Sequence, residues 1–361
     1  MTQQSTVSLQ SAVGSGSIRE DLQNFISNVD RDETPLISMV SMTKASNVRH
    51  DWLTDVYNDP MAQTVLEGAP FHQVGIDAND PNSAAAGTMS NQTARTRLDN
   101  WTQIFREQIE VSNTAVAVNT AGIANEFAYQ IKKKGVEVRR NVEYQATRYN
   151  ATGSLKNGGA TRRMGSLFTY IANPTGTGRF GNLVDNQSTA GTFTYATPGT
   201  GASLPVLSGG TGGPRAVQRD SVEELITNMY GNGGRPNVCL ISHRLKTSFS
   251  RQFNANNTTS TVDTIRRMTS MEDKLNIAIS GVMTDFGFDI GIKPSYIMQL
   301  NGATSHALLF DTNMVQQAVL RKLSVGRFDD NGDGKRALMT TECTLQVKNP
   351  NSVGAIFNLA S

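Results

Sequence analysis

Cysteine is scarce in this sequence of 361 residues, which contains two, Cys239 and Cys343. They stand far apart in the strand-like runs VCLI and TECTLQV, so a disulfide framework and a Cys-x-x-Cys metal pair are both excluded. Free cysteine is among the most buried residue types. We therefore expect two buried, reduced thiols.

An excess of charge of either sign is also missing. The chain has 33 Lys and Arg residues against 31 Asp and Glu residues, a formal net charge of +2. Proteins dedicated to nucleic acid draw much of their affinity from a basic surface that neutralises phosphates. The balance therefore argues against a dedicated DNA- or RNA-binding protein.

Long apolar runs are absent as well, since none approaches the ~18 to 20 residues that a membrane-spanning helix needs. The first ten residues, MTQQSTVSLQ, lack the basic residues and the apolar stretch of a signal peptide. We expect a soluble protein that is made in a cytoplasm and does not contact a membrane.

Enzyme motifs are missing too. The sequence has no Gly-x-Ser-x-Gly elbow and no Gly-x-x-x-x-Gly-Lys loop, and its four histidines lack the spacing of a metal site. A Gly-x-Gly-x-x-Gly match at 176–181 follows no strand and precedes no clear helix, which a dinucleotide site requires. We predict no catalytic residue, no cofactor and no metal site.

The run DDNGDGK at 329–335 resembles the start of a calcium-binding loop. Its twelfth position, which should be Glu, is Thr340. We interpret the run as a tight turn between two strands and leave open whether it binds a cation.

Residues 122–151 give the strongest helix signal. Apolar residues recur there at helical spacing: Ile123, Phe127, Ile131, Val138, Val142 and Tyr149. At ~1.5 Å per residue this helix would span about 45 Å. We expect that Gly135 allows a bend and that the lysine run at 132–134 forms a solvated face.

Two alternating segments, 46–57 and 98–111, are typical of half-buried strands. The first places Trp52 on its apolar face, and the second places Trp101 and Phe105 on its apolar face. About forty residues rich in Asn, Asp, Ala, Pro and Gly separate the segments, so we expect a long hairpin. We predict that Trp52, Trp101 and Phe105 form a cross-strand aromatic set.

The rest of the chain mixes helical and strand patterns. Helices are expected at 162–173, 219–234 and 243–253, and strands at 237–242 and in several segments after 275. Because strands and helices do not alternate regularly, an α+β fold is favoured over a doubly wound sheet.

Several separated blocks resemble the major capsid proteins of tailed bacteriophages, and most closely those of certain short-tailed phages. These blocks are ETPLISMV, DWLTD, EGAP, NWTQIFREQIEVSNTA, the long helix and TLQVKNPNSVGAIFNLA. The resemblance implies the Hong Kong 97-type capsid fold, which is α+β. It implies an N-terminal arm at 1–45, an extended loop at 46–111, a peripheral domain with a spine helix at 112–155 and 312–361, and an axial domain at 156–311.

The resemblance also implies a function, that of a major capsid protein whose hexamers and pentamers form the icosahedral head around a double-stranded DNA genome. Portal, scaffolding and decoration proteins are expected partners, and contact with packaged DNA is expected to be weak and non-specific. The chain is expected in the virion, after assembly in the host cytoplasm. The arm and the loop are expected to contact other subunits rather than their own domain, with Trp52, Trp101 and Phe105 as inter-subunit contact candidates or as anchors of the hairpin base.

Two alternatives stay open. One is another virion structural protein, of a tail or a decoration. The other is a polysaccharide-active phage enzyme, for which Asp51 with Asp55 and Glu223 with Glu224 are the nearest carboxylate pairs.

A covalent cross-link is not expected in the shell. The name-giving member of the fold joins a lysine of the extended loop to an asparagine of a neighbour. Residues 45–110 of this chain contain no lysine, and an arginine guanidinium stays protonated and is not an available nucleophile.

Overall fold

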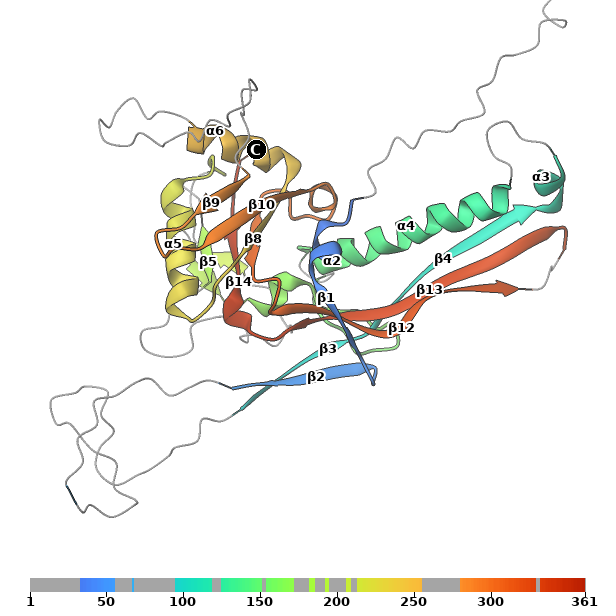
Figure 1. The fold of residues 1–361 in the computed structure, drawn as a ribbon, viewed down its shortest axis with the longest axis horizontal. Coiled ribbons are helices and arrows are strands. Elements are labelled where there is room, and N and C mark those ends of the chain that lie inside the picture. Colours follow the sequence, from blue (N-terminus) through green and yellow to red (C-terminus); the bar gives the residue numbers. More distant parts are fainter. Residues whose placement is uncertain are drawn as a thin grey trace, which may run out of the picture. The chain divides into compact units, whose positions relative to one another are not determined.

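The computed structural model describes residues 33–55, 67, 95–118, 125–150, 154–171, 182–185, 192–194, 206–208, 213–254, 280–328 and 332–360. The chain divides into two compact units (Figure 1). Unit 1 comprises Met1–Glu33, Phe105–Asn141 and Leu323–Thr341, and unit 2 comprises Thr34–Ile104, Val142–Lys322 and Glu342–Ser361.

Unit 2 is built on a six-stranded sheet of order β5-β14-β11-β8-β10-β9. The strands are β5 (Leu183–Asp185), β8 (Val238–Ser242), β9 (Gly281–Met283), β10 (Asp289–Ser295), β11 (Ala307–Phe310) and β14 (Val353–Phe357). Every residue of β8, β11 and β14 is buried. Their continuous apolar runs are what a strand covered on both faces requires.

Two helices pack on this sheet, α5 (Arg219–Gly231) and α6 (His243–Asn254). Leu225 and Met229 of α5, and Leu245 and Phe249 of α6, enter one apolar cluster with Leu309 and other sheet residues. This cluster is the main core of unit 2.

Unit 2 also holds shorter elements. They are α2 (Pro35–Met39), β1 (Ser41–Lys44), the pairs β2 (Arg49–Thr54) with β3 (Thr96–Trp101) and β6 (Thr192–Thr194) with β7 (Val206–Ser208), and the 3₁₀ turns η1 (Leu167–Tyr170), η2 (Ile297–Gln299) and η3 (Pro350–Ser352).

Unit 1 combines one long helix with long strands. Its elements are β4 (Gln103–Ser112), α3 (Asn113–Ala117), α4 (Glu126–Ala146), β12 (Val315–Phe328) and β13 (Gly334–Val347), of which β4, α4, β12 and β13 also include residues of unit 2. The sheet order is β1-β12-β13-β4. Buried Ile109, Val111 and Ala337 form a small cluster against Phe127 and Ile131 of α4.

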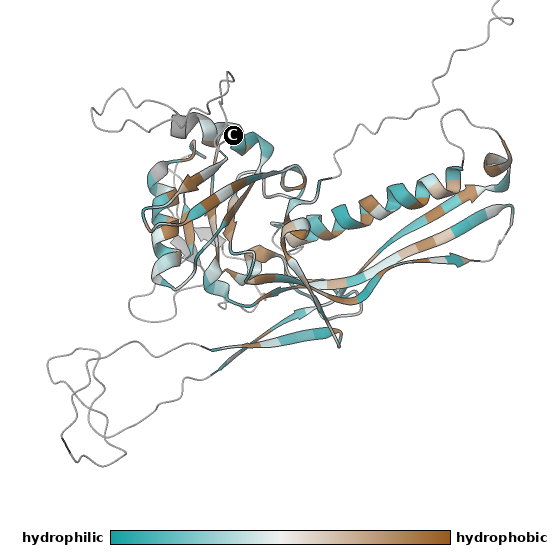
Figure 2. Cartoon of the chain, in the orientation of Figure 1, coloured by the Kyte–Doolittle hydropathy of each residue, from teal (hydrophilic) through white to brown (hydrophobic). Residues whose placement is uncertain are grey.

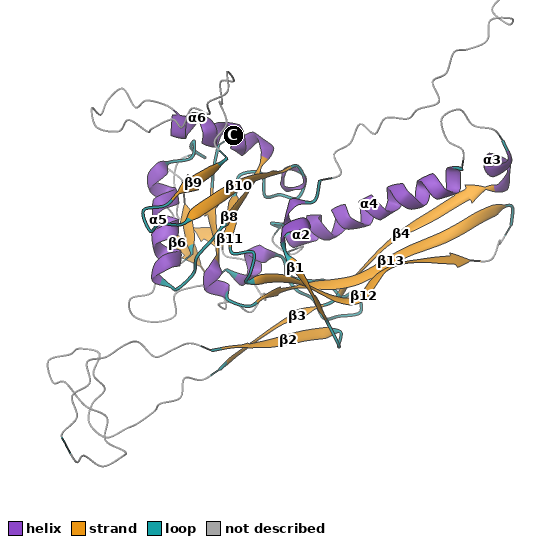
Figure 3. Cartoon of the chain, in the orientation of Figure 1, coloured by secondary structure: helices purple, strands orange, loops and turns teal. Residues whose placement is uncertain are grey.

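The architecture confirms the α+β prediction and most predicted elements (Figure 3). The predicted long helix is α4, at 126–146 rather than 122–151, and it continues through Gly135. Hydrophilic and hydrophobic residues alternate along it, as its amphipathic pattern predicted (Figure 2). Cys239 and Cys343 are both buried and free, as expected.

The helix predicted at 162–173 is wrong. Only η1 forms in the described part of this segment, because Ser166 N, which would bond to the carbonyl of residue 162 in a helix, donates to the Ser154 carbonyl at 2.9 Å. Side chains of other segments hold the two preceding amides. Met164 N donates to Gln103 Oε1 at 3.1 Å, and Gly165 N donates to Asn100 Oδ1 at 2.9 Å. Tertiary hydrogen bonds therefore override the local pattern.

Some predictions fall outside the described residues. The glycine motif at 176–181 lies there, as do Asp329, Asp330 and Asn331. Since β12 ends at Phe328 and β13 begins at Gly334, the DDNGDGK run does connect two strands, as predicted. Among the described helices, none is long and apolar enough to cross a membrane.

Candidate functional site: the loop base and the arm anchor

The register of β2 and β3 separates the aromatic residues of the predicted loop. Trp52 stands opposite Leu98, and Arg49 stands opposite Trp101. Opposed residues project to the same face and successive residues alternate, so Trp52 and Trp101 lie on opposite faces. Phe105 lies further along, in β4. The predicted cross-strand aromatic set is therefore wrong. The face that each tryptophan occupies depends on the register between the two strands, which neither strand's sequence specifies alone.

Trp52 anchors the base of the hairpin within its own unit. It is buried, and its Nε1 donates to the Val347 carbonyl at 2.8 Å. Its ring centroid lies 6.0 Å from that of Tyr170. Trp52 thus takes the anchoring role, while contact of Trp52, Trp101 or Phe105 with another subunit stays a prediction.

Asn100 reinforces the same base. This buried residue donates from Nδ2 to the Leu345 carbonyl at 2.9 Å, and its Oδ1 accepts from Gly165 N at 2.9 Å. A buried amide with several partners fixes the local geometry, since losing one partner would leave a buried polar group unsatisfied.

Ion pairs lie on the face of the β2–β3 hairpin opposite to that of Trp52. Asp99 accepts from Lys156 Nζ at 2.8 Å and lies 3.3 Å from Arg49 Nε. Burial, together with the charge of Asp99, raises the pKa of Tyr170 well above its usual value. Tyr170 therefore stays protonated and donates to the Asp99 carbonyl at 2.8 Å.

The carboxylates considered for a polysaccharide enzyme do not form catalytic pairs. Asp51 contacts Arg97 and Arg49, and Asp55 contacts Arg95. The hydrogen bond and charge of Asp51 raise the pKa of Arg97. Glu223 and Glu224 lie exposed on α5. These acids belong to a solvated surface.

Glu342 is a buried carboxylate that joins four segments. Its side chain is 4% exposed. Its Oε1 accepts from Thr102 Oγ1 at 2.8 Å and from Arg162 Nη2 at 2.9 Å, and its Oε2 accepts from Arg321 Nε at 2.8 Å. Thr102 lies between the end of β3 and the start of β4. This network therefore fixes the position at which the chain passes from the β2–β3 hairpin into β4.

Glu143 of α4 anchors the end of the predicted arm. It is fully buried, and its Oε1 and Oε2 accept from Leu36 N at 3.0 Å and Ile37 N at 2.8 Å. These are the first amides of α2, where an acidic group satisfies free donors and favours the helix dipole.

The expectation that the arm does not pack on its own domain is wrong for residues 34–45, while contact of these residues with other subunits stays a prediction. Leu36 and Ile37 are buried within unit 2, and β1 pairs in parallel with β12. The apolar run PLISMV supplies that burial. Residues 1–32 lie outside the described part of the chain.

His306 lies in an aromatic cluster of unit 2. Its ring centroid is 4.5 Å from both Tyr149 and Phe357. Burial lowers the pKa of His306 to about 4. The imidazole is therefore neutral at pH 7 and is a core residue.

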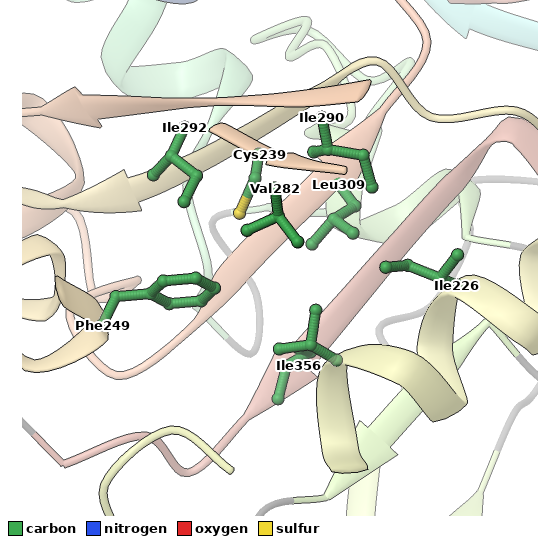
Figure 4. Close-up of a pocket in the computed structure, with 9 residues that line it drawn as sticks. Ile226, Cys239, Phe249, Val282, Ile290, Ile292, Leu309 and Ile356 are labelled. Carbon is green, nitrogen blue, oxygen red and sulfur yellow. The ribbon is translucent and has the colours of Figure 1, made fainter. Parts of the chain in front are cut away.

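A small cavity in the core of unit 2 is lined only by apolar side chains and a thiol (Figure 4). Burial raises the pKa of that thiol, Cys239, to about 12, so it stays protonated and unreactive. Substrate pockets carry convergent polar groups, which this lining lacks. In the part of the chain that the structure describes, no group of acidic, His or Cys side chains could hold a metal ion.

Known capsid proteins resemble this chain in sequence and fold. A curated major capsid protein of Escherichia phage Phieco32 is 31% identical over 120 residues, which is 33% of this chain and 30% of that protein. The capsid of a native GTA particle matches at 12% identity with a TM-score of 0.59, covering 97% of this chain and 99% of that one. Chains of Gordonia phage Cozz (13% identity, 97% and 94% covered, TM-score 0.54) and Mycobacterium phage Ogopogo (10%, 99% and 99%, 0.55) also match.

At these identities the structural matches establish the fold, and the predicted Hong Kong 97-type capsid fold is confirmed. The sequence match to the curated relative spans about a third of that protein's length. The family model described as SU10 major capsid protein matches residues 1–360. The chain therefore belongs to the SU10 major capsid protein family, whose members are structural proteins and not enzymes.

Proposed function

We propose that this chain assembles with itself, as hexamers and pentamers, into the icosahedral head that encloses a phage double-stranded DNA genome. The observation that carries the proposal is the end of β12. All eight residues from 321 to 328 are exposed, and three of them are large and apolar: Leu323 (45%), Val325 (41%) and Phe328 (57%). A strand exposed in this way is a surface for contact with other copies.

The loop base and the arm anchor support the same function. Contacts at Trp52, Asn100 and Glu342 hold the base of the extended loop against other segments of unit 2. Glu143 holds the first amides of α2, at the end of the arm. Segments anchored at one end gain large interfaces when they reach over neighbours.

We assign the parts of the capsid fold as the resemblance implied. The arm is 1–45, of which 1–32 would reach other subunits, and the extended loop is 46–111. The peripheral domain is 112–155 with 312–361, and the axial domain is 156–311. Strand β11 of the axial domain pairs with β14 of the C-terminal segment. Portal, scaffolding and decoration proteins are the expected partners, and assembly takes place in the host cytoplasm.

Expression of the full chain alone, followed by electron microscopy and sedimentation, tests the proposal. Shells, tubes or capsomers are the expected result. A monodisperse monomer at high concentration would contradict self-assembly.

The same particles test the absence of a cross-link. Boiling in detergent should give one band near 39.0 kDa. A reductant-resistant ladder would mean that a lysine outside 45–110 is the donor.

A further inference from the structure

One face of α4 concentrates positive charge. At 3.6 residues per turn, Lys132, Lys133 and Arg139 fall on the side of the helix opposite Phe127, Ile131 and Val138. We call these three residues the cationic face. All three are exposed.

The glutamates of this part of α4 do not neutralise the cationic face. Glu137 bonds with Lys134, which also lies 3.3 Å from Glu107 of β4, and Glu126 accepts from Gln130 Nε2 at 2.6 Å. Lys134 is thus the lysine of the run that is ion-paired within unit 1. On a helix whose surface is merely solvated, charges of opposite sign commonly alternate at spacings of three and four. Here the outward positions of residues 129–140 carry the cationic face beside the uncharged Tyr129 and Val136.

We propose that the cationic face binds the phosphate backbone of double-stranded DNA. The inference rests on the proposed function, which encloses such a polymer next to many copies of this chain. Lys132 to Arg139 spans about 10 Å along the helix axis, and DNA carries one negative charge per ~1.7 Å of its axis. The face can therefore meet several phosphates at once without reading sequence.

The weak net charge of the chain fits this role. With a formal charge of +2, a single copy binds DNA weakly, and affinity comes from many copies acting together. Contact with DNA is then non-specific and sensitive to salt, as backbone neutralisation requires.

Fluorescence anisotropy with a labelled random duplex and unassembled full-length protein tests the proposal across a salt series. The variant K132Q/K133Q/R139Q should reduce the slope of log affinity against log salt by about 2.7, at ~0.9 per lost phosphate contact. The wild type should accordingly lose about 40-fold more affinity than the variant between 50 and 200 mM salt.

The matched control is K44Q/R244Q/K293Q, which removes the same charge from exposed positions of unit 2. This control should keep the wild-type slope. Equal slopes for all three proteins, or equal reductions in both variants, would overturn the proposal.

A rival occupant is the segment 56–94 of a second copy, which has four acidic residues and no Lys or Arg. Assembly of empty shells without DNA separates the two. The site variant should assemble as the wild type does. Poor assembly of that variant with an unchanged DNA slope would overturn the proposal in favour of the loop segment.

Lysine acetylation of intact heads gives a second readout that needs no variant. Lys132 and Lys133 should react more slowly in DNA-filled heads than in heads emptied of DNA, while Lys293 reacts equally in both. Equal reaction of Lys132 and Lys133 in both kinds of head would contradict DNA binding. If the wild type forms no assembly at all, the proposed function fails, and the duplex titration still judges the cationic face independently.

Discussion

The two units differ in the size of their buried apolar cores. Among the described residues, the core of unit 2 joins sixteen buried side chains over its sheet and helices, whereas the core of unit 1 joins three. Strand β12 shows the contrast within one element, since Val315 and Ala318 are buried in unit 2 and residues 323–328 are exposed in unit 1.

This difference separates two tasks. Unit 2 is stabilised by its own apolar burial and by buried polar anchors at Glu143 and Glu342. Unit 1 has a thin core and a surface that combines exposed apolar residues with the cationic face. We infer that unit 1 gains much of its stability from neighbouring copies, because burial there increases only on assembly.

The largest expected effect concerns the two tryptophans at the loop base. Trp52→Ala removes a buried ring and its hydrogen bond to Val347, and should lower the free energy of unfolding by about 3 to 5 kcal/mol. Trp101→Ala removes a half-buried ring. It should lower the free energy of unfolding less than Trp52→Ala does and reduce the yield of assembled particles more. Urea unfolding of free subunits measures stability, and sedimentation of particles measures assembly yield. A larger stability loss for Trp101→Ala would break the distinction.

Core truncations sharpen the comparison between the units. Leu309→Ala should cost about 2 to 5 kcal/mol, because it removes a buried side chain and enlarges the cavity that Leu309 lines. Ile109→Ala in the small cluster of unit 1 should cost less, and its effect should stay local. Hydrogen exchange by peptide measures both. If Ile109→Ala accelerates exchange in β8, β11 and β14, the units are not independent in the way we describe.

Glu143 tests the polar anchor. Glu143→Ala leaves the amides of Leu36 and Ile37 without their carboxylate, which should cost about 2 to 4 kcal/mol. Glu137→Ala on the same helix removes a partly exposed ion pair and should cost at most about 1 kcal/mol. Thermal and urea unfolding measure the stability that each variant loses. Equal losses would mean that Glu143 does not act as an anchor of the arm.

The buried His306 gives unit 2 a pH dependence. Its folded pKa of about 4 lies below the ordinary 6.5, so the unfolded chain binds the proton more readily. Stability from this group is complete above pH 6.5 and is lost as pH falls toward 4. The loss should be about 2 kcal/mol between pH 6.5 and pH 5.

His306→Phe should remove this part of the pH dependence, measured as the difference from wild type in urea unfolding at each pH. The control His243→Asn, at an exposed position of α6, should keep it. An unchanged profile in His306→Phe would mean that other groups cause the acid sensitivity.

Local patterns predicted the elements whose signal is contained in one segment. The runs VCLI, ALLF and VGAIF predicted the buried strands, and apolar spacing predicted α4. The aromatic set at the loop base could not be predicted, because the faces of Trp52 and Trp101 follow from the pairing register.

The buried anchors were missed for a related reason. Glu143 meets Leu36 from 107 residues away, and Glu342 meets Thr102 from 240 residues away. A glutamate within a strand-like run, as in TECTLQV, is the one signal that could have identified Glu342. The cationic face was visible in the sequence as a lysine run, but Lys134 turned out to be ion-paired to Glu107 and Glu137.

Hydrogen exchange of free subunits and assembled particles, compared peptide by peptide, tests the central claim most directly. We predict that assembly slows exchange strongly in residues 320–328 of β12. The strands β8, β11 and β14 should change little, since they are already buried in the free subunit. Protection gained mainly in those three strands, with residues 320–328 unchanged, would contradict the division between a self-contained unit 2 and a unit 1 completed by its neighbours.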